Sequence, residues 1–141
     1  MHVLSASTDA DLDAVFAKLI ELRAGGLVIG PSAFFNARAE QLAALALHQA
    51  LPTVYESLPF VEAGGLASYG GSLTDSYRLA GVYAGRILKG EKPGELPVLQ
   101  GTKVELFLNL KTARALGITV PLPLLGRADK VIDRNAICCS A

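Results

Sequence analysis

The spacing of apolar residues changes repeatedly along this chain, and this change constrains the fold more than any other feature. Short apolar runs, such as residues 27–29 and 53–55, are followed by segments in which apolar residues recur every three or four positions. The first pattern is typical of buried strands, and the second of helices that pack by one face. The alternation predicts an α/β fold with a mostly parallel sheet and helices on both faces.

The predicted elements follow one another with short connections. We expect strands at residues 2–6, 27–29, 53–55, 66–69 and 103–109. Helices are expected from Thr8 to the Gly25-Gly26 stop, and over 36–50, 72–89 and 110–116, with short helical turns at 58–62 and 124–132. The helix over 72–89 carries small residues on one face, which predicts close packing against a neighbour: Leu79, Ala80, Gly81, Ala84, Gly85 and Leu88.

Composition narrows the class of protein further. The 141 residues are 51% hydrophobic and 18% charged, which fits one folded domain with its own core. Thirteen basic and thirteen acidic residues cancel, so charge gives no reason to expect nucleic acid as a partner. No apolar run approaches a membrane span and no signal peptide is visible, which predicts a cytoplasmic chain if Met1 is the true start. Cys138 and Cys139 are adjacent and imply no disulfide framework.

Candidate binding residues lie where predicted strands end, because ligands of such sheets bind outside the carboxyl ends of the strands. The loop after residues 27–29 contains Ser32, Phe34, Phe35 and Asn36. Either one phenylalanine forms an apolar wall for a ligand or both anchor the core, and the sequence favours neither. Asn36 is expected to cap the helix that follows.

The next two strand ends contribute further candidates. Tyr55 offers a ring and a hydroxyl, and Glu56 could pair with a ligand ammonium group. The candidates of the third strand end are Ser68, Tyr69 and Gly70, where Gly70-Gly71 permits close backbone approach, and Asp75 follows in the first turn of a helix.

The sequence offers little for catalysis. His2 and His48 have no Cys, Asp or Glu at ligand spacing, so we expect no metal. Neither a dinucleotide-binding glycine pattern nor a nucleophile elbow surrounds the glycines and serines of the strand ends. A binding site without cofactor is therefore the favoured interpretation.

An ordered series of short motifs extends over most of the chain. It includes Phe34-Phe35-Asn36, Leu51-Pro52-Thr53-Val54-Tyr55, Val61–Gly70 with its Gly64-Gly65 pair, Tyr77-Arg78, Ile87-Leu88-Lys89-Gly90, Lys103-Val104-Glu105-Leu106, Asn109–Ala113, Leu116-Gly117-Ile118 and Arg127–Ile132. In order and spacing, the chain from about Leu4 to Ile132 resembles the C-terminal half of ABC-transporter substrate-binding proteins of the tryptophan/tyrosine type.

The resemblance implies a periplasmic-binding-protein-like fold of type I, in which two α/β lobes close on a small ligand. It implies an aromatic amino acid or a related compound as ligand, an ABC permease as partner, and a periplasmic or cell-surface location. The strand-end residues named above, from Ser32 to Asp75, would line the cleft. No catalysis is expected.

The resemblance also predicts how the chain is divided. Residues 1–134 would form a single lobe, with residues 68–96 as a crossover element that belongs to the missing first lobe. The chain would return near Pro97, and the helix of this element would repack, pair with another copy or protrude. The first strand and helix of the second lobe also have no counterpart here, and residues 135–141 form a tail outside the pattern.

Two other hypotheses remain. The chain could be a small cytosolic α/β module that forms a homodimer through an exposed edge or an unpaired helix and senses a metabolite. It could also be an enzyme of Rossmann-like shape, which would need a reactive cluster that the sequence does not reveal.

Overall fold

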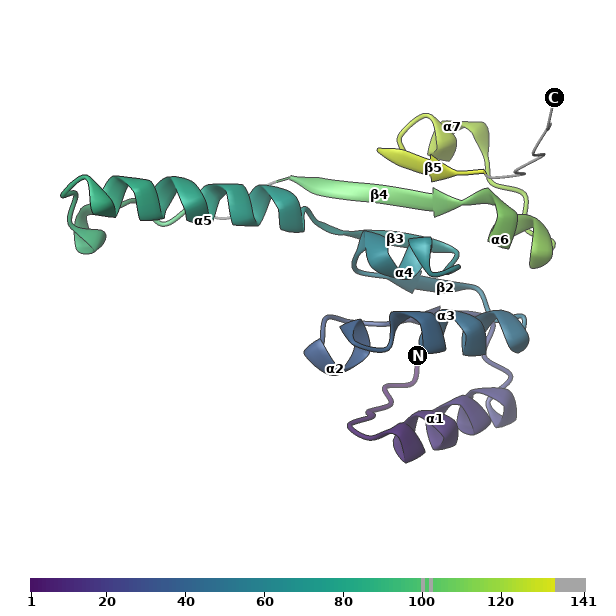
Figure 1. Cartoon of the computed structure of the whole chain (residues 1–141). Coiled ribbons are helices and arrows are strands. Elements are labelled where there is room, and N and C mark those ends of the chain that lie inside the picture. Colours follow the sequence, from purple (N-terminus) through teal and green to yellow (C-terminus); the bar gives the residue numbers. More distant parts are fainter. Residues whose placement is uncertain (100, 102, 134–141) are drawn as a thin grey trace, which may run out of the picture.

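The computed structural model describes residues 1–99, 101 and 103–133, and its centre is a five-stranded sheet in the order β1-β2-β3-β4-β5 (Figure 1). The strands are β1 (Leu27–Val28), β2 (Thr53–Tyr55), β3 (Ala67–Gly71), β4 (Val104–Asn109) and β5 (Lys130–Ile132). Only β3 and β4 pair antiparallel. The predicted mostly parallel α/β sheet is therefore confirmed, while the tail with Cys138 and Cys139 lies outside the described residues.

Seven α-helices accompany the sheet in the described part of the chain. They are α1 (Asp9–Glu21), α2 (Ala33–Asn36), α3 (Ala39–His48), α4 (Leu58–Glu62), α5 (Leu73–Leu88), α6 (Leu110–Ala115) and α7 (Leu122–Leu125), with one 3₁₀ turn at Pro93–Glu95. None of the described helices is both long enough and apolar enough to cross a membrane.

The largest core lies on one face of β1 and β2. Helices α3 and α4 pack there, because successive right-handed crossovers that move in one direction place their helices on the same face. Helix α1, which precedes β1, packs on the same core through Leu12, Phe16 and Leu19. The buried residues that form this core are Leu12, Phe16, Leu19, Ile29, Leu42, Ala46, Leu51, Tyr55 and Phe60.

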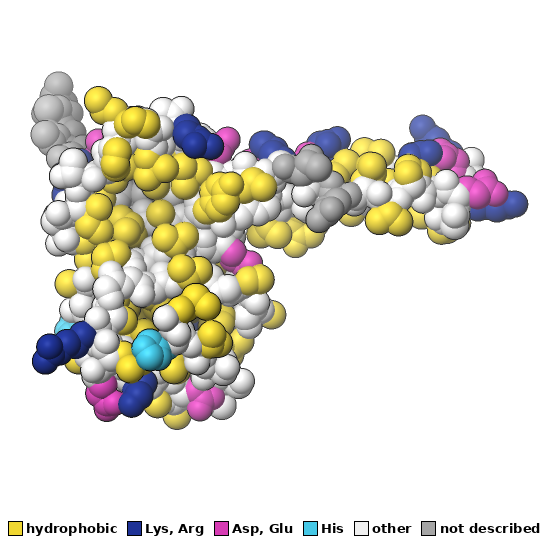
Figure 2. All heavy atoms as spheres, turned by 180° about the vertical axis from the view of Figure 1, so that it is seen from behind, with side chains coloured by type: hydrophobic (Ala, Val, Ile, Leu, Met, Phe, Trp, Pro, Cys, Tyr) yellow, Lys and Arg dark blue, Asp and Glu magenta, His cyan; other side chains and the backbone are white. Residues whose placement is uncertain are grey.

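The other face of β1–β3 is largely open. The strand register aligns Val28 with Val54, and Val54 with Ala67, so these side chains and that of Tyr69 lie on the face away from the core helices, where Ala67 is the one of the four that is buried. Val28 is 78% exposed and Tyr69 is 65% exposed. Helices α3 and α4 lie in front of the sheet in Figure 1, and Figure 2 shows from behind that hydrophobic side chains gather over the body of the molecule.

Three predicted elements are wrong. Residues 2–6 form no strand, since no described backbone group pairs with them. The helix expected over 36–50 is divided, because the hydroxyl of Ser32 caps the short α2 and α3 begins only at Ala39. Residues 124–132, which were expected to be helical, contain the end of α7 and then β5. Asp129 anchors this segment to β4: the Asp129 backbone N–H donates to the Leu106 carbonyl, and the Asp129 carboxylate accepts from the Leu106 amide, both at 2.8 Å.

Helix α5 projects from the sheet as an arm (Figure 1). None of its residues is buried, and a Cβ added at Gly81 or Gly85 would meet no atom within 4 Å. The close helix packing predicted for its small residues is therefore absent from the described chain. The return segment lies along the helix, where the Tyr83 hydroxyl donates to the carbonyl of Pro97 at 2.5 Å and Arg86 pairs with Glu91 at 2.6 Å.

Candidate ligand-binding edge

The carboxyl ends of β1, β2 and β3 meet at one edge of the sheet because these strands are parallel. We call this the strand-end edge. It comprises the loop and helix α2 after β1, Glu56 after β2, and Tyr69-Gly70 at the end of β3, together with the first turn of α5. The α5 arm leaves the body of the molecule from this edge (Figure 1).

Helix α2 brings two aromatic rings to the strand-end edge. Phe34 and Phe35 pack edge to face, with ring centroids 5.6 Å apart and planes at 64°. Both rings are partly buried against the main core, which favours their role as anchors, and neither is fully enclosed. Asn36 is exposed and is the last residue of α2, so the prediction that it caps a helix is wrong. Ser32 is the cap instead, accepting from the Phe34 amide at 3.2 Å.

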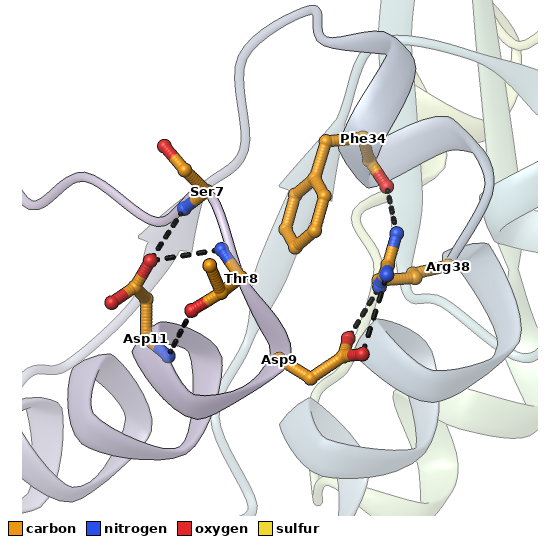
Figure 3. Close-up of polar contacts among 6 residues, drawn as sticks. All are labelled: Ser7, Thr8, Asp9, Asp11, Phe34 and Arg38. Carbon is orange, nitrogen blue, oxygen red and sulfur yellow. Dashed lines mark hydrogen bonds and ion pairs between the residues drawn. The ribbon is translucent and has the colours of Figure 1, made fainter.

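Arg38 lies between Asp9 of α1 and Phe34 of the aromatic pair (Figure 3). Its guanidinium lies 4.0 Å from the centroid of the Phe34 ring, and its Nε donates to the Asp9 carboxylate at 2.5 Å. The hydrogen bond to Arg38 lowers the pKa of Asp9, and the same bond raises the pKa of Arg38. The Arg38 charge is thus compensated within the fold and is not left free for a ligand anion.

Sequence reasoning did not single out the Asp9–Arg38 pair as part of the site. The spacing of Phe34 and Arg38 could have revealed half of it, because residues four apart contact each other on helical backbone and arginine commonly stacks on an aromatic ring. Asp9 is 29 positions from Arg38, and only the packing of α1 brings the two together. Thr8 caps α1 beside Asp9: its hydroxyl accepts from the Asp11 amide at 3.2 Å while its own amide donates back to the Asp11 carboxylate (Figure 3).

Two of the predicted site residues lie inside the core. Tyr55 is 2% exposed and stacks on Phe60 of α4 with ring centroids 4.8 Å apart, and Ser68 is 1% exposed. Neither the Tyr55 Oη nor the Ser68 Oγ has a hydrogen-bond partner among the described residues. Burial raises the pKa of Tyr55 to about 12. In this conformation a ligand reaches neither side chain, which corrects their expected place at the surface of the edge.

The loop after β2 and the end of β3 are in direct contact. A Cβ added to Gly70 would lie 2.1 Å from the carbonyl oxygen of Glu56, so only glycine fits there, and the expected close backbone approach is confirmed at Gly70. At Gly71 an added Cβ would meet nothing within 4 Å. The side chains of Glu56 and Tyr69 remain accessible at this point.

Asp75 is held within α5. Its amide donates to the Ser72 hydroxyl that caps the helix, and its carboxylate pairs with Arg78 at 2.9 Å. The structure therefore brings six predicted residues to the accessible strand-end edge: Phe34, Phe35, Asn36, Glu56, Tyr69 and Gly70. Asp75 lies beside them at the base of the arm and Ser32 acts as a cap.

The accessible side chains of the edge suit recognition of a small polar molecule with an apolar part. Rings from α2 and β3 offer apolar contact, and Glu56 offers a carboxylate. A hollow of about 620 Å³ lies on the helix side, between the start of α3 and α4, and Asn36 is its only member from the predicted site. Among the residues that the structure describes, no three His, Cys, Asp or Glu side chains are grouped to hold a metal ion.

Comparison with known proteins identifies relatives that match most of this chain. The sequence profile of the family "ABC transporter substrate binding protein" matches residues 4–132. A conserved domain protein from Vibrio cholerae O1 biovar El Tor is 26% identical and superposes with a TM-score of 0.75 over 89% of this chain and 42% of its own. Among curated proteins, none matches this chain significantly.

Two further solved structures share the fold. An ABC domain from Streptococcus pneumoniae, solved in complex with L-Trp, is 24% identical, with a TM-score of 0.76 over 87% of this chain and 40% of its own. A ligand-free, open substrate-binding protein with adhesive properties from Clostridium difficile is 19% identical, with a TM-score of 0.63 over 92% of this chain and 43% of its own. The chain thus spans less than half the length of each similar structure.

Proposed function

Because this chain belongs to the ABC transporter substrate-binding protein family, we propose that it forms one wall of a cleft that captures a small ligand for import, without catalysis. The observation that carries this proposal is the family match over residues 4–132, which includes the whole strand-end edge. Proteins of this family usually work in the periplasm or at the cell surface, and we propose the same location and an ABC permease as the partner.

An aromatic amino acid is the ligand that we propose. The rings of Phe34, Phe35 and Tyr69 offer apolar contact, and Glu56 offers a counter-charge for an ammonium group. The similar Streptococcus pneumoniae domain was solved with L-Trp, which supports the same ligand class. A single wall leaves the far side of the ligand in water, so we expect a Kd of about 1 mM or weaker for this chain by itself.

The opposite wall, we propose, belongs to a second lobe that receives residues 68–96 as a crossover. Helix α5 supports this division, because it buries none of its residues against the described body and leaves from the strand-end edge. Its apolar residues are exposed along the arm, among them Tyr77 and Leu88. A second lobe that covers the arm would also close the cleft.

Thermal denaturation with ligands tests the proposal. At 10 mM ligand, ten times the expected Kd, binding adds about 1.4 kcal/mol to the free energy of unfolding. For a domain of this size that corresponds to an increase in Tm of roughly 4–5 °C. We expect such a shift with L-tryptophan, L-tyrosine or L-phenylalanine and a smaller one with L-alanine.

A carboxylate variant tests the site itself. Glu56→Gln should reduce the shift caused by L-tryptophan but not the shift caused by indole-3-propionate, which has the ring and the carboxylate without the ammonium group. Glu21→Gln on the surface of α1 is the matched control, and it should leave both shifts unchanged. If no aromatic amino acid raises the Tm, or if both variants respond alike, the proposed site is wrong.

A further inference from the structure

Three cations lie around the strand-end edge, and each has a carboxylate partner within the described chain. The pairs, with N···O distances of 2.5, 2.9 and 2.7 Å, are Arg38 with Asp9, Arg78 with Asp75, and Lys103 with Glu105. Glu105 adjoins the edge because it is the register partner of Gly70. Glu56, in contrast, takes part in no ion pair among the residues that the structure describes. The charge that remains open at this edge is therefore negative.

Arg38 is the cation that contacts the aromatic pair. Its guanidinium lies 4.0 Å from the centroid of the Phe34 ring, and its side chain is 29% exposed. A ligand ring that packs on Phe34 would therefore lie beside this guanidinium. Arginine binds carboxylates through two parallel N–H donors. If it had no partner of its own, Arg38 would give the edge a receptor for ligand anions.

Asp9 occupies these donors. The Arg38 Nε donates to one carboxylate oxygen of Asp9 at 2.5 Å, and Nη2 donates to the other at 3.3 Å (Figure 3). The remaining nitrogen, Nη1, donates to the carbonyl of Phe34 at 3.4 Å. The pair of N–H groups that would hold a ligand carboxylate is thus used by Asp9, which also neutralises the Arg38 charge.

The start of α1 assigns different roles to its two first-turn carboxylates. The Asp11 carboxylate accepts from the amides of Ser7 and Thr8 at 2.9 and 2.8 Å, so it is engaged by the backbone. The Asp9 carboxylate instead points to Arg38 (Figure 3). An exposed ion pair contributes little to stability. Its larger effect is on the charge that a ligand meets beside Phe34.

We propose that Asp9 determines the charge selectivity of the strand-end edge: it keeps Arg38 from ligand carboxylates, so the edge selects ring compounds with an ammonium group over those with only a carboxylate. The inference rests on the proposed function, because it concerns the same edge. It extends the ligand class to aromatic amines, since a ring and an ammonium group are sufficient for this edge. A ligand carboxylate held about 6 Å from that of Glu56 in water weakens binding roughly three-fold.

Thermal denaturation with three indole compounds tests this selectivity. Apparent Kd values are obtained from the increase in Tm as a function of the concentration of tryptamine, L-tryptophan and indole-3-propionate. We expect the wild type to bind tryptamine roughly three-fold more tightly than L-tryptophan, and indole-3-propionate most weakly. Asp9→Asn should strengthen the binding of indole-3-propionate roughly three-fold, because the Arg38 guanidinium becomes free. It should not strengthen the binding of tryptamine.

Two further variants separate charge from packing. Asp13→Asn is the matched control on the same helix, because Asp13 is exposed and forms no ion pair in the described part of the chain. It should leave all three Kd values unchanged. Combining Asp9→Asn with Arg38→Gln should return indole-3-propionate to its wild-type Kd, which a mere loosening of α1 would not do.

Each outcome decides between the proposals. An unchanged or weaker affinity of Asp9→Asn for indole-3-propionate would overturn the inference, as would an equal gain in the double variant. If Asp9→Asn does not fold, the wild type decides: indole-3-propionate bound as tightly as tryptamine would overturn the inference. In these cases a response to L-tryptophan leaves the binding proposal standing. No increase in Tm with any of the three compounds would overturn the proposed function together with this inference.

Discussion

Gly70 offers the most direct test of how the strand-end edge is held together. Gly70→Ala adds a single methyl group whose carbon would lie 2.1 Å from the Glu56 carbonyl oxygen and 3.1 Å from its carbonyl carbon. These are backbone atoms, so no side-chain rotation relieves the clash. The loop that carries Glu56 must move, or β3 must shift against β2, to which it is bonded.

The expected cost follows from the environment of the added group. Adding a group to a tightly packed, rigid site usually lowers the free energy of unfolding by about 1–3 kcal/mol. A contact this short with backbone atoms should give a loss at the upper end of that range. We expect a loss of about 3 kcal/mol, equivalent to a decrease in Tm of roughly 9–12 °C. Gly71→Ala is the matched control: its Cβ meets nothing within 4 Å, and alanine is favoured over glycine inside a strand by about 0.5–1 kcal/mol.

Chemical denaturation of both variants, followed by far-UV circular dichroism, measures the two changes. Gly70→Ala should unfold at clearly lower denaturant with an unchanged m-value, and Gly71→Ala at an equal or slightly higher concentration. Equal midpoints for the two variants would refute the assignment of a tight contact between Glu56 and Gly70. The same preparations should show a weaker response to L-tryptophan for Gly70→Ala, because its Glu56 loop is displaced.

Three further predictions concern groups whose environment is fixed by the fold. The pKa of Tyr55 is raised from 10.0 to about 12, so its contribution to the free energy of unfolding is complete below pH 10 and is lost as the pH rises towards 12. Between about pH 9 and pH 11.5, chemical denaturation should therefore show a larger loss of stability for the wild type than for Tyr55→Phe. Asp9→Asn should lower the free energy of unfolding at pH 7. Because the pKa of Asp9 is depressed below 3.8, the difference in stability between wild type and variant should shrink in an acid titration as the pH falls through that lowered value. Gly81→Ala should raise the helicity of the chain measured by circular dichroism. The helix propensity of alanine is about 1 kcal/mol more favourable than that of glycine in an exposed helix, and an added Cβ meets no atom within 4 Å here. No change in helicity would indicate that α5 is not an exposed helix in solution.

Local patterns were sufficient to predict most of the elements and the class of the sheet. Thr8 and Ser72 cap their helices through their own hydroxyls. The strand at 53–55 lies in a short apolar run, and the one predicted over 103–109 shows the alternation of a strand with two different faces. The antiparallel pairing of β3 and β4 was not predicted, because pairing direction depends on where the chain re-enters the sheet after a long excursion. β5 was missed because Lys130 and Val131 become a strand only by pairing with Phe107 and Leu108.

The sequence predicted where the candidate residues lie along the sheet better than it predicted which way their side chains point. The rule of strand ends selected residues that the fold brings to one edge of the sheet, but whether a side chain points to the helices or outward depends on register. Tyr55 and Ser68 are register partners and both point to the buried face, whereas the adjacent Tyr69 points outward. The Arg38–Asp9 pair depends on the packing of α1, which no short-range pattern contains.

The order of the α5 arm depends on whether another surface, such as the proposed second lobe, covers it. A helix of 16 residues that buries no side chain is only marginally stable in water, and here it is supported mainly by its Ser72 cap and the contacts of Tyr83 and Arg86 with the return segment. The exposed residues Tyr77 and Leu88 gain stability only when another surface covers them. Since the arm begins at the strand-end edge, the proposed second lobe that covers it would also adjoin the proposed ligand. Under that proposal, closure of the cleft and ordering of the arm are one event, and a ligand that favours closure should protect the amides of α5 from exchange even where it does not contact them.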